Sequence, residues 1–130
     1  MISDKLRVAI VDDERPVRVA LGRVLRLAAY DVDTFGSGEE FLASVESSRP
    51  ACAILDLHLH GLPGLEVQAR LLAANRQIPV VFITASDDST LDDAARASGG
   101  VQLLRKPFSS GELLKAVGIA LHRDGPAASA

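Results

Sequence analysis

The sequence has little cysteine and no long apolar run, and each shortage excludes a class of protein. Its single cysteine, Cys52, cannot form an internal disulfide and lies in an apolar segment, so we expect a buried thiol, which is compatible with a reducing compartment. No apolar stretch approaches the roughly 18–20 residues that a membrane helix needs. Asp4, Lys5 and Arg7 interrupt the start of the chain, which argues against a signal peptide. We therefore expect a soluble, cytoplasmic protein that does not bind membranes.

Aromatic residues and basic clusters are also scarce. Aromatic residues make up 4% of the chain, the basic residues are scattered, and the net charge of −3 is mildly acidic. A nucleic-acid-binding surface would need clustered positive charge, so we expect no direct nucleic-acid contact. A flavin-binding electron carrier is disfavoured as well, because the sequence offers no aromatic pair to enclose the flavin and no Ser/Thr/Gly-rich loop after its first predicted strand.

Short β-branched apolar runs alternate with segments of helical spacing along nearly the whole chain. The predicted strands are Leu6–Val11, Asp31–Phe35, Ala51–Leu55, Val80–Thr84 and Val101–Leu104. Alternation of this kind predicts a parallel sheet with right-handed crossover helices on both faces, a doubly wound α/β fold with five strands and five helices. The 130 residues suit one domain, which we assign to residues 1–122, with 123–130 as a flexible tail or linker.

Local signals mark the helix ends. Pro16 suits the first turn of a helix, and Gly99-Gly100 suits a helix stop. A third helix is predicted over Leu65–Ala74, and a polar stretch through Asp87, Asp88 and Ser89 opens a fourth. Two capping-box patterns precede apolar helical stripes, at Ser37 with Glu40 and at Ser109 with Glu112.

Polar residues follow or close four of the five predicted strands: Asp12, Asp13, Asp56, Thr84 and Lys106. The carboxyl ends of parallel strands share one edge of the sheet, so we expect these groups to meet there. Three carboxylates in one place repel one another and require a cation, and an all-oxygen ligand set favours Mg²⁺. A second positive charge would come from the lysine.

This combination suits phosphoryl transfer. The metal and Lys106 would neutralise charge on the transferring group, and the Thr84 hydroxyl would hydrogen-bond one of its oxygens. Asp56 is the best candidate for a nucleophile that forms an acyl phosphate, because it stands alone at the end of the central strand. The adjacent Asp12 and Asp13 have the character of a metal platform.

Four strings in the chain resemble the receiver domain of two-component response regulators, over about residues 5–122. They are Val11-Asp12-Asp13-Glu14, Leu55-Asp56-Leu57, Ile83-Thr84-Ala85 and Lys106-Pro107-Phe108. The resemblance implies a flavodoxin-like fold with strand order 2-1-3-4-5. It further implies phosphorylation of Asp56 by a histidine kinase or phosphotransfer protein, as a conformational switch in signal transduction and not as a turnover enzyme.

The resemblance also assigns roles to single residues. Mg²⁺ would bind through Asp13, Asp56 and the backbone carbonyl of His58, with Asp12 helping. Thr84 would be the switch hydroxyl and Lys106 the phosphoryl partner. Pro107 and Gly64 match positions where the family often has a cis peptide and a loop glycine, respectively. The face formed by the fourth helix, fifth strand and fifth helix is where family members bind partners or dimerise. The strings Lys106-Pro107-Phe108 and Glu40-Phe41-Leu42 are similar to those of receivers that precede DNA-binding output domains.

The chain departs from the family pattern at two positions. Leu103 replaces the usual aromatic residue three positions before the lysine, which leaves switching to helix or loop movement, and His60 stands where proline is frequent. Two other functions stay open at this point. A degenerate receiver would bind partners without phosphorylation. An aspartyl-phosphate phosphohydrolase would need a carboxylate at position 58, where this chain has histidine.

Overall fold

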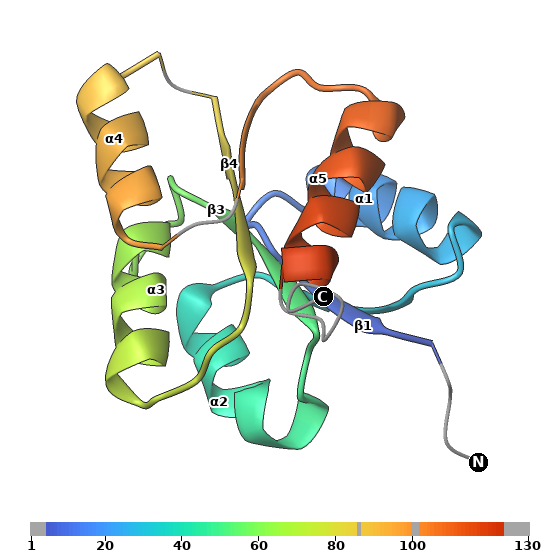
Figure 1. Ribbon diagram of the computed structural model, residues 1–130, viewed down its shortest axis with the longest axis horizontal. Helices are drawn as coiled ribbons and strands as arrows, with labels where there is room; N and C mark the ends of the chain where they lie inside the picture. Colours follow the sequence, from blue (N-terminus) through green and yellow to red (C-terminus); the bar gives the residue numbers. More distant parts are fainter. Residues whose placement is uncertain (1–4, 86, 100–101, 124–130) are drawn as a thin grey trace.

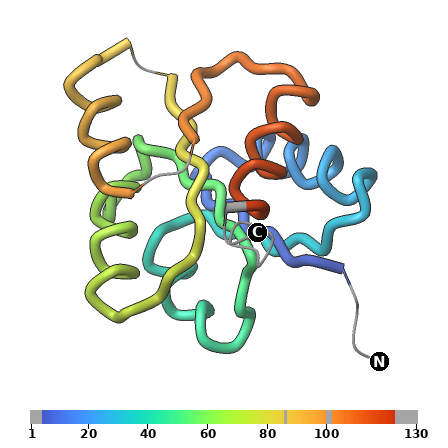
Figure 2. Tube along the Cα trace, viewed as in Figure 1, coloured from blue at the N-terminus to red at the C-terminus, as the bar shows by residue number. Residues whose placement is uncertain are grey.

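A computed structural model describes residues 5–85, 87–99 and 102–123, in which strands and helices alternate strictly (Figure 1). The strands are β1 Arg7–Val11, β2 Asp31–Phe35, β3 Cys52–Asp56, β4 Val80–Thr84 and β5 Gln102–Arg105. The helices are α1 Arg15–Leu27, α2 Gly38–Ser48, α3 Gly64–Ala73, α4 Ser89–Ala97 and α5 Ser110–Arg123. The tube in Figure 2 follows the chain back to the sheet after each of the first four helices. The five predicted βα units are confirmed.

All five strands are parallel and are ordered β2-β1-β3-β4-β5, which confirms the flavodoxin-like doubly wound fold. From β1 the chain adds β2 toward one edge of the sheet, and it then adds β3, β4 and β5 toward the other edge. The strand order therefore reverses between β1 and β3. Every residue of β3 and β4 is buried, whereas β2 is mostly half-buried because it lies at an edge. The weak apolar pattern of Asp31–Phe35 follows from this edge position.

Helices cover both faces of the sheet, α1 and α5 on one and α2, α3 and α4 on the other (Figure 1). Successive strand side chains point to opposite faces, so each strand contributes to two separate cores. The core under α2, α3 and α4 includes Ala9, Val11, Ala53, Leu55, Val80 and Phe82. The core under α1 and α5 includes Val8, Ile10, Cys52, Ile54, Val81 and Ile83. Burying each large aliphatic side chain contributes about 1.5–3 kcal/mol, so these strands hold the sheet rigid.

The local helix signals act as predicted. Pro16 lies in the first turn of α1, and the Ser37 hydroxyl accepts the backbone N–H of Glu40 at 3.1 Å. Ser109 and Glu112 form the reciprocal capping box, with both N–H···O distances at 3.0 Å. Gly99 follows α4 with a φ of 98°, a left-handed conformation that glycine adopts without strain, whereas Gly100 lies outside the described residues.

Some boundaries differ from the predictions by one residue. β1 begins at Arg7 instead of Leu6, and β3 runs to Asp56 because the backbone of this residue stays in register with Ile83 of β4. Polarity of the side chain therefore does not end this strand. Val101 and residues 124–130 lie outside the described residues, so the start of the fifth predicted strand and the tail stay predictions. Among the described residues, no helix is long and apolar enough to cross a membrane.

Gly64, the first residue of α3, lies directly against the end of β3. A Cβ at this position would be 2.5 Å from the carbonyl oxygen of Asp56, which is backbone and cannot rotate away. We expect Gly64→Ala to lower the free energy of unfolding by about 1–3 kcal/mol, measured by urea denaturation. Gly118→Ala is the control, since nothing lies within 4 Å of its added Cβ. This change inside α5 should raise stability by about 0.5–1 kcal/mol. Equal effects of the two substitutions would contradict the close approach at Gly64.

Candidate functional site

The carboxyl ends of the strands meet at one rim of the sheet. β1 leads directly into Asp12, β3 ends at Asp56, β4 ends at Thr84, and Lys106 follows β5. The backbone N–H of Lys106 donates to the Thr84 carbonyl at 2.7 Å, which continues the sheet hydrogen bonding beyond β5. The structure thus brings the predicted strand-end residues together at this rim, as the parallel sheet requires.

Four carboxylates gather there: Asp12, Asp13, Glu14 and Asp56 each offer an oxygen, and these oxygens lie within 4.8 Å of one another. This cluster could hold a metal ion, since carboxylate oxygens are the ligands of hard divalent cations. Glu14 is a member of this cluster that the sequence pattern did not predict. The signal was its place in the run Asp12-Asp13-Glu14, which follows a buried strand.

Lys106 pairs with the buried carboxylates of this cluster. Its Nζ lies 3.1 Å from Asp12 Oδ2, 3.5 Å from Asp56 Oδ2 and 3.7 Å from Glu14 Oε1. Burial by itself lowers the pKa of this ammonium, but the hydrogen bond to Asp12 and the charges of Asp56, Asp12 and Glu14 together outweigh it. The pKa of Lys106 is therefore raised, and the group stays charged at neutral pH.

Asp12 is fully buried. One of its oxygens accepts the backbone N–H of Glu14 at 2.9 Å, and its carbonyl oxygen accepts Arg18 Nη1 at 2.7 Å. Burial raises the pKa of the Asp12 carboxyl, and the charge of Asp56 adds to the rise, against the lowering effects of the Glu14 N–H and of Lys106. The buried position of Asp12 thus favours the protonated form of its carboxyl relative to an exposed aspartate.

The loop after β3 touches the site through two histidines. The backbone N–H of His58 donates to Asp56 Oδ1 at 2.9 Å, and its ring Nε2 lies 3.1 Å from the Thr84 hydroxyl. The backbone N–H of His60 donates to Asp13 Oδ2 at 3.2 Å, and its ring Nδ1 contacts the same oxygen. The predicted role of His58 in the site was through its backbone carbonyl, and the contact of its ring with Thr84 was not predicted, because the direction of a loop side chain leaves no periodic signal.

Two further features surround this rim. The Lys106–Pro107 peptide is cis, as its family position suggested. Leu103 pairs with Phe82 in the register of β4 and β5 and packs against the core under α2, α3 and α4. An aliphatic side chain therefore occupies the place where the family usually has an aromatic ring.

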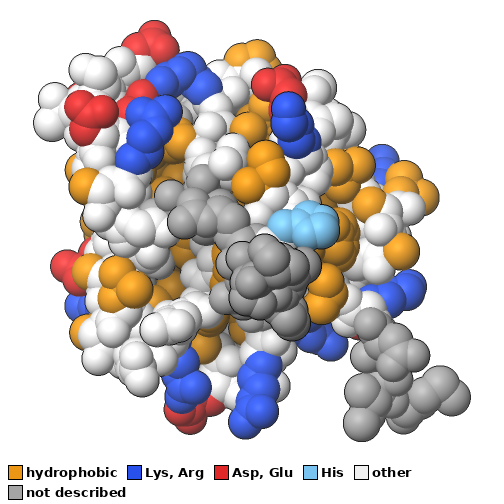
Figure 3. All heavy atoms as spheres, in the orientation of Figure 1, with side chains coloured by type: hydrophobic (Ala, Val, Ile, Leu, Met, Phe, Trp, Pro, Cys, Tyr) orange, Lys and Arg blue, Asp and Glu red, His pale blue; other side chains and the backbone are white. Residues whose placement is uncertain are grey.

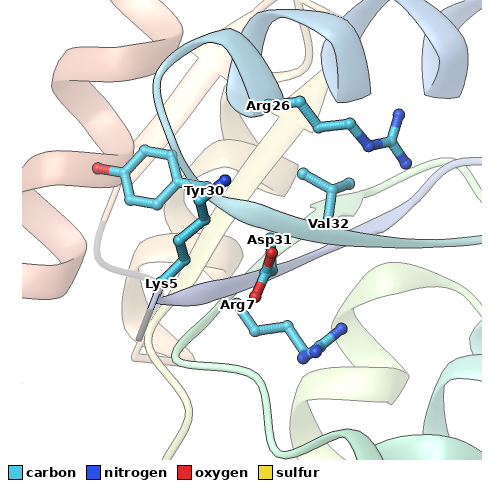
Figure 4. Close-up of a pocket in the computed structure, with 6 residues that line it drawn as sticks. All are labelled: Lys5, Arg7, Arg26, Tyr30, Asp31 and Val32. Carbon is cyan, nitrogen blue, oxygen red and sulfur yellow. The ribbon is translucent and has the colours of Figure 1, made fainter. Parts of the chain in front are cut away.

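A separate hollow of about 440 Å³ lies at the opposite end of the sheet (Figure 4). It is bordered by the starts of β1 and β2, and its lining residues are Lys5, Arg7, Arg26, Tyr30, Asp31 and Val32. Arg7 is paired with Asp33 at 3.0 Å. Because strands start there, this hollow takes no part in the acidic cluster at the carboxyl ends.

The raised pKa of Asp12 predicts a gain in stability for Asp12→Asn. An acid whose folded-state pKa exceeds its unfolded value near 3.8 destabilises the fold fully above the folded pKa and not at all below the unfolded one. In metal-free buffer at pH 7 we expect Asn at this position to raise the melting temperature by a few degrees, the shift that about 1 kcal/mol produces in a domain of this size.

The difference between Asp12→Asn and the unsubstituted protein should shrink as the pH falls through the folded pKa, measured by thermal melts across the acid range. Asp93→Asn on the exposed surface of α4 is the matched control and should change stability by less than about 0.5 kcal/mol. A loss of stability in Asp12→Asn at pH 7, or a gain in stability that does not change with pH, would show that burial does not penalise the charged form of Asp12.

Comparison with known proteins agrees with this geometry. The family model of the response regulator receiver domain matches residues 8–118. Nodulation protein W of Bradyrhizobium diazoefficiens is 38% identical over 122 residues, which are 94% of this chain and 54% of that protein. Transcriptional regulatory protein TdiR of Thauera aromatica is 34% identical over 114 residues, which are 88% of this chain and 50% of that protein.

A solved structure supports the same relationship. Full-length FixJ from B. japonicum superposes with a TM-score of 0.90 at 28% identity, covering 98% of this chain and 63% of that one. The chain spans about half the length of the two relatives named above. Since the family model covers most of the chain and the fold has the same strand order, the chain belongs to the response regulator receiver domain family of two-component signalling.

Proposed function

We propose that this receiver domain is a phosphorylation-controlled switch in which Asp56 accepts a phosphoryl group from a histidine kinase or phosphotransfer protein. The observation that carries the proposal is the position of the buried Asp56 carboxylate, 3.5 Å from Lys106 Nζ and inside the acidic cluster. Thr84 closes the neighbouring strand. The cytoplasm is the proposed location, where reducing conditions suit the buried thiol of Cys52.

The proposed metal is Mg²⁺. Asp13, Asp56 and the backbone carbonyl of His58 would hold it, with Asp12 helping through water. The fit is supported by the four clustered carboxylates, and burial, with a smaller contribution from the charge of Asp56, raises the pKa of Asp12, so that a bound cation would stabilise its charged form. When bound, Mg²⁺ would neutralise charge on the transferring phosphoryl group.

In the proposed transfer, an oxygen of Asp56 attacks the phosphorus of a phosphohistidine. The new O–P bond forms as the P–N bond breaks, and the leaving imidazole keeps the electron pair and takes up a proton. The ammonium of Lys106 stabilises charge on the phosphoryl oxygens, and the Thr84 hydroxyl donates a hydrogen bond to one of them. The domain promotes its own phosphorylation and dephosphorylation and is not a turnover enzyme.

Phosphorylation of Asp56 is directly testable by intact mass. Incubation with Mg²⁺ and acetyl phosphate or phosphoramidate should add one labile phosphoryl group, because both donors carry an activated phosphoryl that the site can accept. The adduct should be absent without Mg²⁺ and absent in Asp56→Asn, which keeps the side-chain shape but lacks the nucleophile.

Beryllofluoride binding controls for an adduct that hydrolyses too fast to be seen. If neither an adduct nor Mg²⁺-dependent beryllofluoride binding is found, the phosphoryl switch is wrong and a receiver-shaped binding module remains. Continuous release of phosphate from added phosphomonoesters would favour a phosphohydrolase instead.

We also propose that the phosphorylation state is read on the face formed by α4, β5 and α5. Arg105 of β5 contacts the buried Asp92 of α4 and lies 3.7 Å from Asp87. Acidic and basic side chains lie side by side over α4 in Figure 3. Arg105 pairs with Thr84 in the register of β4 and β5 and directly precedes Lys106. A change at the proposed phosphoryl site would therefore act on residues that adjoin this ionic contact. The output would be a DNA-binding domain or a separate partner, a role supported by the name of TdiR.

Dimerisation through this face is expected to depend on activation. Sedimentation velocity at matched protein concentrations should show a shift from monomer toward dimer when Mg²⁺ and beryllofluoride are added, because the activated face then pairs with its copy. Asp56→Asn should show no shift. A sedimentation coefficient that stays unchanged, with beryllofluoride bound, would contradict activation-dependent dimerisation while leaving the phosphorylation proposal intact.

A further inference from the structure

His58 connects the proposed phosphoryl acceptor with the proposed switch hydroxyl. Its backbone N–H donates to Asp56 Oδ1 at 2.9 Å, while its ring Nε2 lies 3.1 Å from Thr84 Oγ1. Asp56 and Thr84 are buried, whereas His58 is exposed in the turn after β3. The loop residue His58 therefore contacts both the buried Thr84 hydroxyl and the carboxylate of Asp56.

The backbone of Thr84 is held in place by the sheet. Thr84 is the last residue of β4, pairs with Arg105 of β5, and its carbonyl accepts the Lys106 N–H at 2.7 Å. The hydroxyl can therefore change position by rotation about χ1 without breaking the sheet. A β-branched side chain occupies a few discrete rotamers, so its hydroxyl has separate positions and no continuous range.

A phosphoryl group on Asp56 would compete with His58 for this hydroxyl. Threonine has a single O–H donor, which the His58 ring accepts in the tautomer that carries its proton on Nδ1. The proposed function requires this same donor to point at a phosphoryl oxygen. We infer that His58 is a positioning residue that holds Thr84 in its resting orientation, so that activation must break the contact between His58 Nε2 and Thr84 Oγ1. This inference rests on the proposed function of Asp56.

Leu103 makes such a restraint informative. In the family, an aromatic ring at the position of Leu103 usually moves together with the threonine. In this chain Leu103 is aliphatic and packs against the core beside Phe82. The described contact to the Thr84 hydroxyl comes instead from the loop after β3. In this proposal, the loop after β3 contributes to the balance between resting and active states from the acceptor side of the site.

Beryllofluoride affinity at saturating Mg²⁺ tests the inference, because this phosphoryl mimic reports the equilibrium without hydrolysis. Isothermal titration calorimetry would compare the unsubstituted protein with His58→Ala and His58→Phe. The phenylalanine keeps a planar ring but cannot hydrogen-bond. Losing one restraining hydrogen bond should lower the dissociation constant about 3- to 10-fold in both variants.

A double-mutant cycle separates the hydroxyl from other effects of the ring. In a Thr84→Ala background, His58→Ala should leave beryllofluoride affinity unchanged, because the contact no longer exists. His122→Ala is the matched control. This exposed histidine lies at the end of α5 beside Leu6, at the opposite end of the sheet, and should have no effect.

Each outcome decides between the alternatives. Unchanged or weaker binding in both His58 variants would overturn the restraint, and weaker binding would indicate that the ring supports the active state. An effect that persists in Thr84→Ala would also overturn it, because the ring would then act on the phosphoryl mimic directly. Failure of the unsubstituted protein both to bind beryllofluoride and to form the phosphoryl adduct would refute the proposed function itself, which is a different result from equal affinities.

Discussion

The rest of this site depends on one lysine placed among carboxylates. Lys106 Nζ lies within 3.7 Å of oxygens from Asp12, Asp56 and Glu14, and it is thus paired with both buried carboxylates of this cluster. Without it, the pKa of the Asp12 carboxyl, which burial already raises, would be higher still. The raised pKa of Asp12 shows that even this compensation is partial. The site is therefore electrostatically suited to gain a further cation.

Such a site is tolerated because the sheet around it is rigid. β3 and β4 are buried along their whole length and supply side chains to both cores. The apolar burial there offsets the cost of keeping charges at the rim. Rigidity also means that a response to the proposed phosphorylation would arise in side chains and loops, since the strands themselves have little freedom to move.

The loop after β3 is the natural place for that response. His58 contacts Thr84 at the end of β4, and His60 contacts Asp13 after β1. The loop thus spans the acceptor, the hydroxyl and the acidic cluster. Beyond Thr84, the pairing of Arg105 with Asp92 connects the same rim to α4. A chemical change at Asp56 and a change of the α4 face are therefore separated by only a few direct contacts.

The five βα units and the shared rim can be predicted from the amino-acid sequence alone. Apolar periodicity identifies strands and helices, and parallel strands bring every carboxyl end to one edge, so that Asp56, Thr84 and Lys106 had to meet. Only the tertiary structure decided that Glu14 joins the carboxylates and that the His58 ring reaches Thr84. The physical reason is that a loop side chain is oriented by contacts with other elements, here 26 residues away in the sequence, which no local pattern encodes.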